Sequence, residues 1–198
     1  MSFRKEIKFS LNKTKMHQFL EWIENKGAQK LYDERNISSI YFDNKRFLMY
    51  HDSIEGIIPR KKIRLRNYNN EKKYLFEKKI SSPEGRFKES KKFLNYKEVL
   101  NKGILDDQYG VCEPKIIVNY KRKYFSYKNF RITLDQNISY SKFYGKYDSF
   151  NKFFDDELVA EVKGNKLDQD FLDNHFPFIT SRFSKYCRGV DMIFNNKI

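Results

Sequence analysis

The segment Arg60–Tyr68, with the sequence Arg-Lys-Lys-Ile-Arg-Leu-Arg-Asn-Tyr, constrains the fold more than any other part of this chain. Read in steps of two, Arg64 and Arg66 fall on one face and Ile63 and Leu65 on the other, which is the pattern of a β-strand. Arginine makes up only 11 of the 40 basic residues, so this Arg-x-Arg pair stands out from a lysine-rich background. The planar guanidinium matches the oxygens of phosphate or carboxylate, and the pair is therefore a candidate phosphate-binding motif. The alternative interpretation is a basic strand with a solvated face.

The same alternation of charged and mostly apolar residues recurs along the chain. It is found in the segments Arg4–Phe9, Leu75–Lys79, Arg131–Asp135 and Ala160–Lys163. A face turned to bulk water does not need acidic and basic residues mixed within each strand. A sheet that closes into a barrel, in contrast, turns one face of every strand inward. The pattern therefore predicts a closed barrel with a charged interior, suited to a polyanion.

Length and composition agree with this prediction. The 198 residues fit a single domain, residues 1–198, and the 19 Phe and 14 Tyr provide material for a core. The net charge of +14 and the pI of about 9.6 favour a polyanionic partner, which is a nucleic acid, an anionic membrane or a phosphate-rich small molecule.

Motifs for other chemistries are missing from the sequence. Cys112 and Cys187 lie far apart and outside any CxxC pattern, so neither a metal knuckle nor a disulfide scaffold is predicted. The three histidines form no pattern typical of a metal site or a triad. No apolar run reaches transmembrane length and no signal-peptide core opens the chain, so a soluble, cytoplasmic protein is expected.

The periodicity predicts an α+β domain in which a few helices surround an antiparallel barrel. Strands are expected at residues 3–9, Ile37–Phe42, Arg60–Tyr68, Tyr74–Ile80, Lys115–Phe125, Phe130–Asp135 and Leu158–Lys163, and a further strand is expected to contain Arg86 and Lys88. Helices are expected at Lys13–Lys26, Arg46–Ser53, Leu94–Leu100 and Asp168–Asn174 and near the end of the tail Arg182–Phe194. The region Ile138–Asp156 has no clear period and is interpreted as a loop or an irregular strand.

The sequence resembles the VTC domain, the catalytic domain of the vacuolar transporter chaperone polyphosphate polymerase, and in particular its stand-alone bacterial forms. These proteins belong with the CYTH phosphatases to the triphosphate tunnel metalloenzymes. The motifs that carry the resemblance are Arg-Lys-Glu-Ile-Lys-Phe at 4–9, Ser-Ile-Tyr-Phe-Asp at 39–43, Arg60–Tyr68, Phe-Glu-Lys-Lys at 76–79, Tyr-Lys-Arg at 120–122, Arg-Ile-Thr-Leu-Asp at 131–135, Glu-Val-Lys at 161–163 and Arg-Phe-Ser-Lys-Tyr at 182–186. Each motif is weak alone, but their common order through nearly the whole chain is specific.

The resemblance implies a tunnel of antiparallel strands that binds a triphosphate or polyphosphate beside a divalent ion, Mn²⁺ or Mg²⁺. The catalytic and phosphate-binding wall would consist of Lys8, Arg64, Arg66, Lys79, Arg122, Arg131 and Lys185, with Lys88, Arg182 and Ser184 as further phosphate-binding residues. Arg86 is an alternative to Lys88. The metal ligands would be Glu161 and Glu6. The first strand carries fewer glutamates than the CYTH relatives do, which favours the polymerase-like branch.

Three functions remain open at this point. The first is a polyphosphate polymerase that uses ATP and a polyphosphate or pyrophosphate primer. The second is a hydrolase of tripolyphosphate or nucleoside triphosphates, and the third is a non-catalytic polyphosphate- or nucleic-acid-binding module. Glu161 argues against a pure binder, which needs no carboxylate. The arginines of the central strand alternate with aliphatic residues rather than exposed aromatics, so no nucleic-acid partner is expected. A membrane-protein partner in cells is allowed, and the oligomeric state is undetermined.

Several nearby residues are assigned structural roles. Glu77 is expected to be a partner for interior cations, and Asp135 to be an orienting or turn carboxylate. Ser184 is expected either to contact phosphate or to cap a helix. The tyrosines Tyr41, Tyr68 and Tyr120 are expected to pack, and Asp43 to end a strand.

Overall fold

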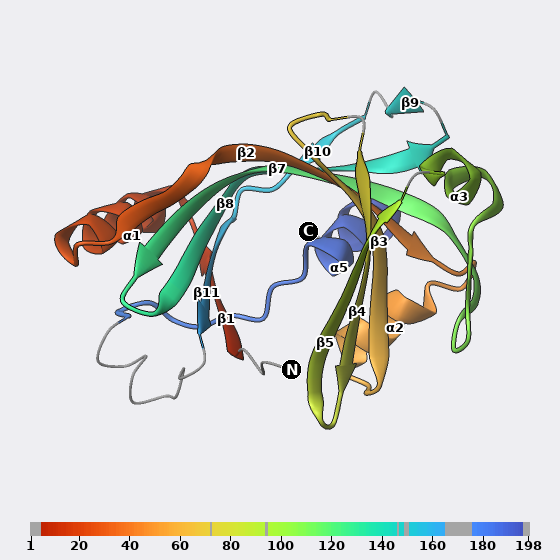
Figure 1. Cartoon of the computed structure of the whole chain (residues 1–198), viewed down its shortest axis with the longest axis horizontal. Helices are drawn as coiled ribbons and strands as arrows, with labels where there is room; N and C mark the ends of the chain where they lie inside the picture. Colours follow the sequence, from red (N-terminus) through yellow and green to blue (C-terminus); the bar gives the residue numbers. More distant parts are fainter. Residues whose placement is uncertain are drawn as a thin grey trace. The chain divides into compact units, whose positions relative to one another are not determined.

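The protein is described by a computed structural model over residues 5–71, 73–93, 95–145, 147–148, 151–164 and 176–195. Its strands are β1 (Lys5–Leu11), β2 (Gln29–Asp43), β3 (Arg60–Tyr68), β4 (Tyr74–Ser82), β5 (Gly85–Phe93), β6 (Ile104–Asp106), β7 (Gly110–Tyr127), β8 (Phe130–Tyr144), β9 (Tyr147–Asp148), β10 (Phe153–Phe154) and β11 (Leu158–Gly164). Its helices are α1 (Lys13–Asn25), α2 (Leu48–Glu55), α3 (Tyr96–Lys102), α5 (Lys185–Val190) and the π-helix η1 (Asp191–Asn195) (Figure 1). Among the described residues, no helix is long and apolar enough to cross a membrane.

The strands form a sheet in the order β1-β11-β8-β7-β2-β3-β4-β5, to which β6, β9 and β10 add short pairings. The pairs β1–β11, β11–β8, β2–β3, β3–β4 and β4–β5 are antiparallel. This confirms the α+β class with an antiparallel sheet. Within the described strands the hydrogen-bonded path ends at β1 and at β5, so closure into a barrel stays a prediction.

The chain divides into two compact units. Unit 1 comprises Met1–Arg35, Tyr120–Ile138 and Asp155–Phe183, and unit 2 comprises Asn36–Asn119, Ser139–Phe154 and Ser184–Ile198. The strands β2, β7 and β8 contribute residues to both units. That residues 1–198 form a single domain stays a prediction.

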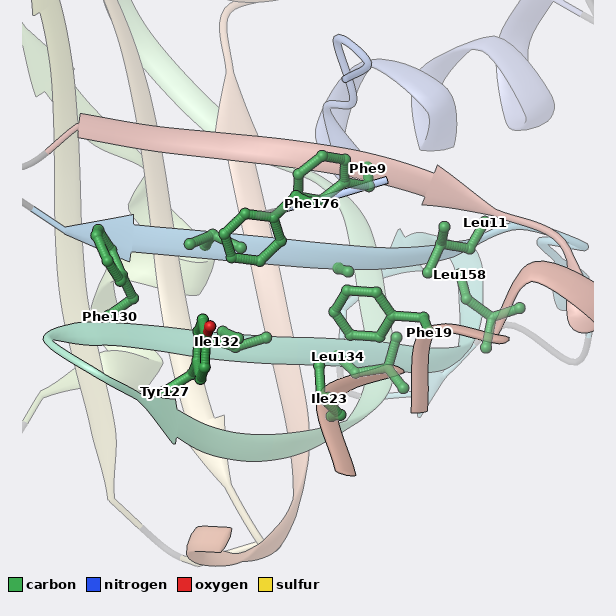
Figure 2. Packing of buried hydrophobic residues seen from close by; sticks show 12 residues of the cluster. Phe9, Leu11, Phe19, Ile23, Tyr127, Phe130, Ile132, Leu134, Leu158 and Phe176 are labelled. Carbon is green, nitrogen blue, oxygen red and sulfur yellow. The ribbon is translucent and has the colours of Figure 1, made fainter. Parts of the chain in front are cut away.

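Unit 1 has an apolar core between α1 and one face of β1, β11 and β8. Asn12 caps α1 by accepting a hydrogen bond from the backbone N–H of Lys15 at 2.8 Å. The apolar side of α1 buries Phe19 and Ile23, which Figure 2 shows beside Leu134 of β8. The other members of the cluster are Phe9, Leu11, Tyr127, Phe130, Ile132, Leu158, Ala160, Val162 and Phe176. Because strand side chains alternate, this core leaves the opposite face of the same strands to the charged residues.

Unit 2 is organised around β3, β4 and β5, which lie side by side with α2 next to β3 (Figure 1). The strands predicted at Arg60–Tyr68 and Tyr74–Ile80 are confirmed as β3 and β4, which pair antiparallel. Ile63 and Leu65 are fully buried, as the alternation in the central strand predicts for its apolar face. The arginines of β3 therefore lie on the face opposite to Ile63 and Leu65.

Several boundaries differ from the sequence-based expectations. The region from Ile138 was interpreted as irregular, but β8 continues as a regular strand to Tyr144, and β9 and β10 pair with it. Strand β2 begins at Gln29, eight residues before the predicted start. The expected helix Asp168–Asn174 lies outside the described residues. The expected terminal helix is present as α5 and η1.

The apolar face of the unit 2 hairpin includes one buried ion-pair cluster. Lys61 Nζ lies 3.0 Å from Asp106 Oδ1, and Lys78 Nζ lies 2.9 Å from Asp106 Oδ2. The Asp106 side chain is fully buried. Burial by itself raises the pKa of Asp106, but hydrogen bonds from Lys78, the backbone N–H of Gln108 and Lys61, together with the charge of Lys78, outweigh it, and the pKa falls to about 2. The charged form of Asp106 thus stabilises the folded state.

Asparagine at position 106 is expected to reduce stability in a pH-dependent way. Because the folded-state pKa of Asp106 is depressed, its contribution is present above the unfolded pKa of about 4 and is lost as the pH falls through about 2. The deficit of Asp106→Asn in the free energy of unfolding should be about 2–3 kcal/mol near neutral pH. Urea titrations of both proteins from neutral to acidic pH measure this deficit. A deficit that does not shrink in acid would contradict the assignment.

Candidate phosphate-binding and acidic sites

The charged face of unit 2 is built from cross-strand rows on β3, β4 and β5. Lys62, Lys79 and Lys88 form one row, because Lys62 pairs with Lys79 and Lys79 with Lys88. Arg64 pairs with Glu77 in the next row. Cross-strand partners in an antiparallel sheet point to the same side, so these side chains share one face. The rows place four cations and one carboxylate close together.

Glu77 is the centre of this face and is almost completely buried, at 1% exposure. Its Oε2 accepts from Arg64 Nε at 2.7 Å and lies 2.6 Å from Arg64 Nη2. Arg66 Nη1 lies 3.6 Å from the same oxygen, and Lys88 Nζ lies 2.5 Å from Oε1. The Lys88 contact is an ion pair without hydrogen-bond alignment, because among the described residues Oε1 accepts no hydrogen bond.

The charges around Glu77 do not balance. Burial favours the neutral acid, but the charges of Arg64, Arg66 and Lys88 outweigh it and hold the pKa of Glu77 well below its ordinary value. Glu77 is therefore ionised, and one negative charge faces three positive ones. The expected role of Glu77 as a partner for interior cations is confirmed, and the face keeps a positive excess that an anion would neutralise.

A tyrosine pair borders the arginines. The hydroxyl of Tyr41 accepts from Arg64 Nη1 at 2.8 Å, and its ring stacks on Tyr186 with centroids 5.2 Å apart. Tyr186 donates to Asp43 Oδ2 at 2.5 Å. Asp43 ends β2 as predicted, and its carboxylate also accepts from the backbone N–H groups of Met49 and Tyr50 at the start of α2. A buried carboxylate thus fixes α5 and α2 to the end of β2.

Ser184 and Lys185 begin α5. The Ser184 hydroxyl caps the helix by accepting from the backbone N–H of Cys187 at 3.3 Å. It also accepts from Lys62 Nζ at 2.9 Å. The helix-capping role, one of the two expected roles of Ser184, is therefore confirmed, and its contact with phosphate stays a prediction. The cap ties the start of α5 to the cationic row of β3.

The charged face of unit 1 combines acidic and basic groups on β1, β11 and β8. Glu6 pairs with Lys163, and Lys8 pairs with Glu161. Lys163 Nζ bridges the two carboxylates, at 3.0 Å from Glu6 Oε2 and 2.6 Å from Glu161 Oε1. Lys8 Nζ lies 3.5 Å from Glu6 Oε1. Arg131, on β8, pairs with Lys163 and is exposed.

Hydrogen bonds hold two further basic parts of unit 1 in place, the side chain of Arg122 and the segment around Arg182. Arg122 Nη2 donates to Asp135 Oδ2 at 2.7 Å, and Arg122 Nε to Oδ1 at 2.5 Å. Burial disfavours the charged guanidinium, but Asp135 outweighs it and raises the pKa of Arg122 well above its ordinary value. Asp135 is thus an orienting carboxylate, as expected. Arg182 is exposed, and hydrogen bonds from Ser181 N to Lys8 O (2.8 Å) and from Lys8 Nζ to Phe183 O (2.9 Å) hold its segment against β1.

The acidic residues of unit 1 fit a divalent ion in the chemistry of their donors. Carboxylate oxygens are the ligands that Mg²⁺ and Mn²⁺ prefer, and Glu6 and Glu161 already share one cation, the ammonium of Lys163. Within the described part of the chain no group of three or more His, Cys, Asp or Glu side chains could hold a metal. A metal ion on Glu6 and Glu161 would therefore need further oxygen ligands from water or phosphate.

The structure places the predicted site residues in two sets, one in each unit. Unit 1 holds Glu6, Lys8, Arg122, Arg131, Glu161 and Arg182, and unit 2 holds Arg64, Arg66, Lys79, Lys88, Ser184 and Lys185. Their catalytic, phosphate-binding and metal-binding roles stay predictions. The sequence-based site left out Lys62 and Lys163, although both belong to the alternating pattern of their strands. It also assigned Tyr41 to packing, because the contact with Arg64 depends on the pairing of β2 with β3.

Solved structures share this fold. A candidate adenylate cyclase from Bacillus halodurans matches with a TM-score of 0.60 and 13% identity over 98% of both chains. A candidate adenylyl cyclase from Hippeastrum, described as having a dominant triphosphatase activity, matches with a TM-score of 0.56 and 15% identity over 96% of both chains. A protein from Pyrococcus horikoshii matches with a TM-score of 0.55 and 15% identity, over 96% of this chain and 99% of that chain. These low identities show the fold alone.

The family is shown by the sequence itself. The VTC domain model matches residues 3–111 and 104–194, so the chain belongs to the VTC domain family. No curated protein matches the sequence. The resemblance to the VTC domain that the motifs indicate is confirmed.

Proposed function

We propose that this protein is a polyphosphate polymerase. The γ-phosphate of ATP is transferred to the terminal phosphate of a pyrophosphate or polyphosphate chain. A new P–O bond forms to the terminal oxygen, the bond between the γ-phosphorus and its bridging oxygen breaks, and ADP leaves. The observation that carries the proposal is the buried carboxylate of Glu77, which faces the three cations Arg64, Arg66 and Lys88.

The residues of unit 2 bind and orient the phosphates. Glu77 fixes the guanidinium of Arg64, so that this side chain loses little rotamer freedom when it binds a phosphate. Lys62, Lys79 and Lys185 add point charges. Phosphoryl transfer depends mainly on positioning and on neutralisation of the charge that spreads over the phosphoryl oxygens. The terminal oxygen of the acceptor chain is already anionic, so no general base is required.

Glu161 and Glu6 would hold the divalent ion, Mn²⁺ or Mg²⁺. When bound, such an ion neutralises charge on phosphate oxygens. Arg122, Lys8, Lys163 and Arg131 carry the positive charge of this face, and Asp135 keeps the Arg122 guanidinium in one orientation.

A triphosphatase is the second candidate function. The same groups would bind a triphosphate, and water would replace the acceptor chain as the nucleophile. The triphosphatase activity of the Hippeastrum protein, which shares the fold, favours this candidate.

Phosphorus NMR of the reaction products tests the proposal. Purified protein is incubated with ATP and Mn²⁺, with and without pyrophosphate. We expect resonances of internal polyphosphate phosphates to grow together with ADP, and the rate to fall by about 100-fold or more in Glu161→Ala, because a metal-bound carboxylate is removed. Asp156→Ala, which removes an exposed carboxylate just before β11, should keep the wild-type rate.

The other outcomes are distinct. Orthophosphate and ADP without internal resonances would move the assignment to the triphosphatase. No turnover of ATP, together with tight binding of tripolyphosphate, would identify a binding module and overturn both enzymatic proposals.

A further inference from the structure

Tyr41 occupies an unusual position for a tyrosine that only packs. It is 6% exposed, and it lies on the charged face of unit 2 as the cross-strand partner of Arg64. The charged and titratable groups that act on it are Arg64 and Arg66 from β3 and Lys185 from α5. Burial raises the pKa of Tyr41, but these three cations outweigh it and lower the pKa below its ordinary value. The phenol therefore lies in strongly positive surroundings.

Among the described residues, the hydroxyl of Tyr41 is seen to act as a hydrogen-bond acceptor but not as a donor. Its oxygen accepts from Arg64 Nη1 at 2.8 Å. No group of the described residues is seen to accept the phenol's own hydrogen. A phenol normally both donates and accepts, and a buried donor without an acceptor costs free energy. The cations around it are donors themselves and cannot accept this hydrogen.

The position of the Tyr41 hydroxyl is fixed by the residues that pack against its ring. The ring stacks on Tyr186 at an interplanar angle of 21°, and Tyr186 is held by its hydrogen bond to the fully buried Asp43. Asp43 is held in turn by the backbone at the start of α2. The Tyr41 hydroxyl is therefore a preorganised donor beside the guanidinium that the proposed function assigns to phosphate.

We propose that Tyr41 is a phosphate-contacting residue that donates its hydroxyl hydrogen to a non-bridging oxygen of the phosphate group held by Arg64. This inference rests on the proposed function and names a further residue of the same site. The ligand it selects is an oxyanion with several acceptor oxygens, namely the terminal phosphate of a tripolyphosphate or longer chain. The competing explanation is that Tyr41 only orients Arg64.

Calorimetric titration of the protein with tripolyphosphate tests the proposal. Near neutral pH, Tyr41→Phe should bind tripolyphosphate about 10- to 100-fold more weakly than the wild type, the effect of losing one hydrogen bond to a charged group. The matched control is Tyr68→Phe, because Tyr68 has Arg66 over its ring at 6.0 Å and is assigned to packing. This control should bind as the wild type does.

The pH dependence separates a donor from an orienting group. A phenolate cannot donate, so the advantage of the wild type over Tyr41→Phe should shrink as the pH rises through the lowered pKa of Tyr41. The lysines of the site, Lys62, Lys79, Lys88 and Lys185, are the same in both proteins, so their effect cancels in the ratio of dissociation constants. A ratio that does not change in alkaline solution would indicate that Tyr41 acts only through Arg64.

The outcomes distinguish this inference from the proposed function. A wild type that does not bind tripolyphosphate would overturn both. Binding by the wild type and equal binding by Tyr41→Phe would overturn only the role of Tyr41. If Tyr41→Phe does not fold, the test is made on the wild type instead, by following the ultraviolet absorbance of phenolate as the pH rises. Tripolyphosphate should then move the earliest tyrosine titration to higher pH, and an unchanged titration would overturn the inference.

Discussion

Glutamine at position 77 is expected to lower the free energy of unfolding by about 3–5 kcal/mol, because a buried ion pair loses one partner while the other charges stay buried. Glu77 is 1% exposed, and its carboxylate contacts Arg64, Arg66 and Lys88. Without it, the three cations would lie together without the carboxylate that they share. Urea unfolding of Glu77→Gln and the wild type at neutral pH measures the difference.

The same variant should respond unusually strongly to phosphate. If the face binds phosphates, tripolyphosphate supplies the missing negative charge, so its stabilisation of Glu77→Gln should exceed its stabilisation of the wild type. Glu89→Gln is the control, since Glu89 is an exposed carboxylate on β5 opposite Lys78. A Glu77→Gln variant as stable as Glu89→Gln, or one that gains nothing extra from tripolyphosphate, would contradict the role of Glu77 as the centre of a phosphate-binding face.

Alternation in the sequence predicted the parts of the fold that carry the site. The predicted segment Arg60–Tyr68 coincides with β3. Its apolar residues, Ile63 and Leu65, are buried and alternate with arginines, and only a strand has a side-chain period of two. The helix expected at Lys13–Lys26 is present as α1, Lys13–Asn25. Where the local hydrophobic pattern agrees with the burial in the folded protein, the sequence is sufficient to predict the element.

Other boundaries could not be read in the same way. The first part of β2, Gln29–Asn36, is largely exposed and polar, so no hydrophobic period marks it as a strand. The extension of β8 beyond Ile138 depends on pairing with β9 and β10, which are only two residues long. These segments are strands because of their neighbours rather than their own pattern.

The candidate site also combines features that the sequence predicts with features that depend on strand pairing. The cations and the carboxylate Glu77 are visible in the sequence, but the concentration of three cations on one buried carboxylate depends on the register of β3, β4 and β5. Tyr41 and Tyr186 are separated by most of the chain, and their stacking has no local signal. Residue types could be predicted from sequence, whereas which of them is preorganised required the pairing of strands.

Arg64→Lys separates the geometry of the guanidinium from its charge. The Arg64 fork contacts Glu77 with Nε and Nη2 and Tyr41 with Nη1. Lysine keeps the positive charge but has a single nitrogen, which cannot make these contacts and hold a phosphate in the same geometry. We expect kcat/KM for ATP turnover to fall about 100-fold, which corresponds to about 2.7 kcal/mol of transition-state stabilisation.

Arg60→Lys is the matched control on the same strand. Arg60 Nη1 donates to the backbone carbonyls of Gly56 and Ile57, at 3.2 and 2.9 Å, so its guanidinium binds the loop before β3. Steady-state kinetics of the two variants should show a loss in Arg64→Lys that falls mainly on kcat, since the orientation of the reacting phosphate matters most in the transition state. Equal activities of Arg64→Lys and the wild type would mean that only the positive charge of β3 matters, which is what a solvated basic strand would give.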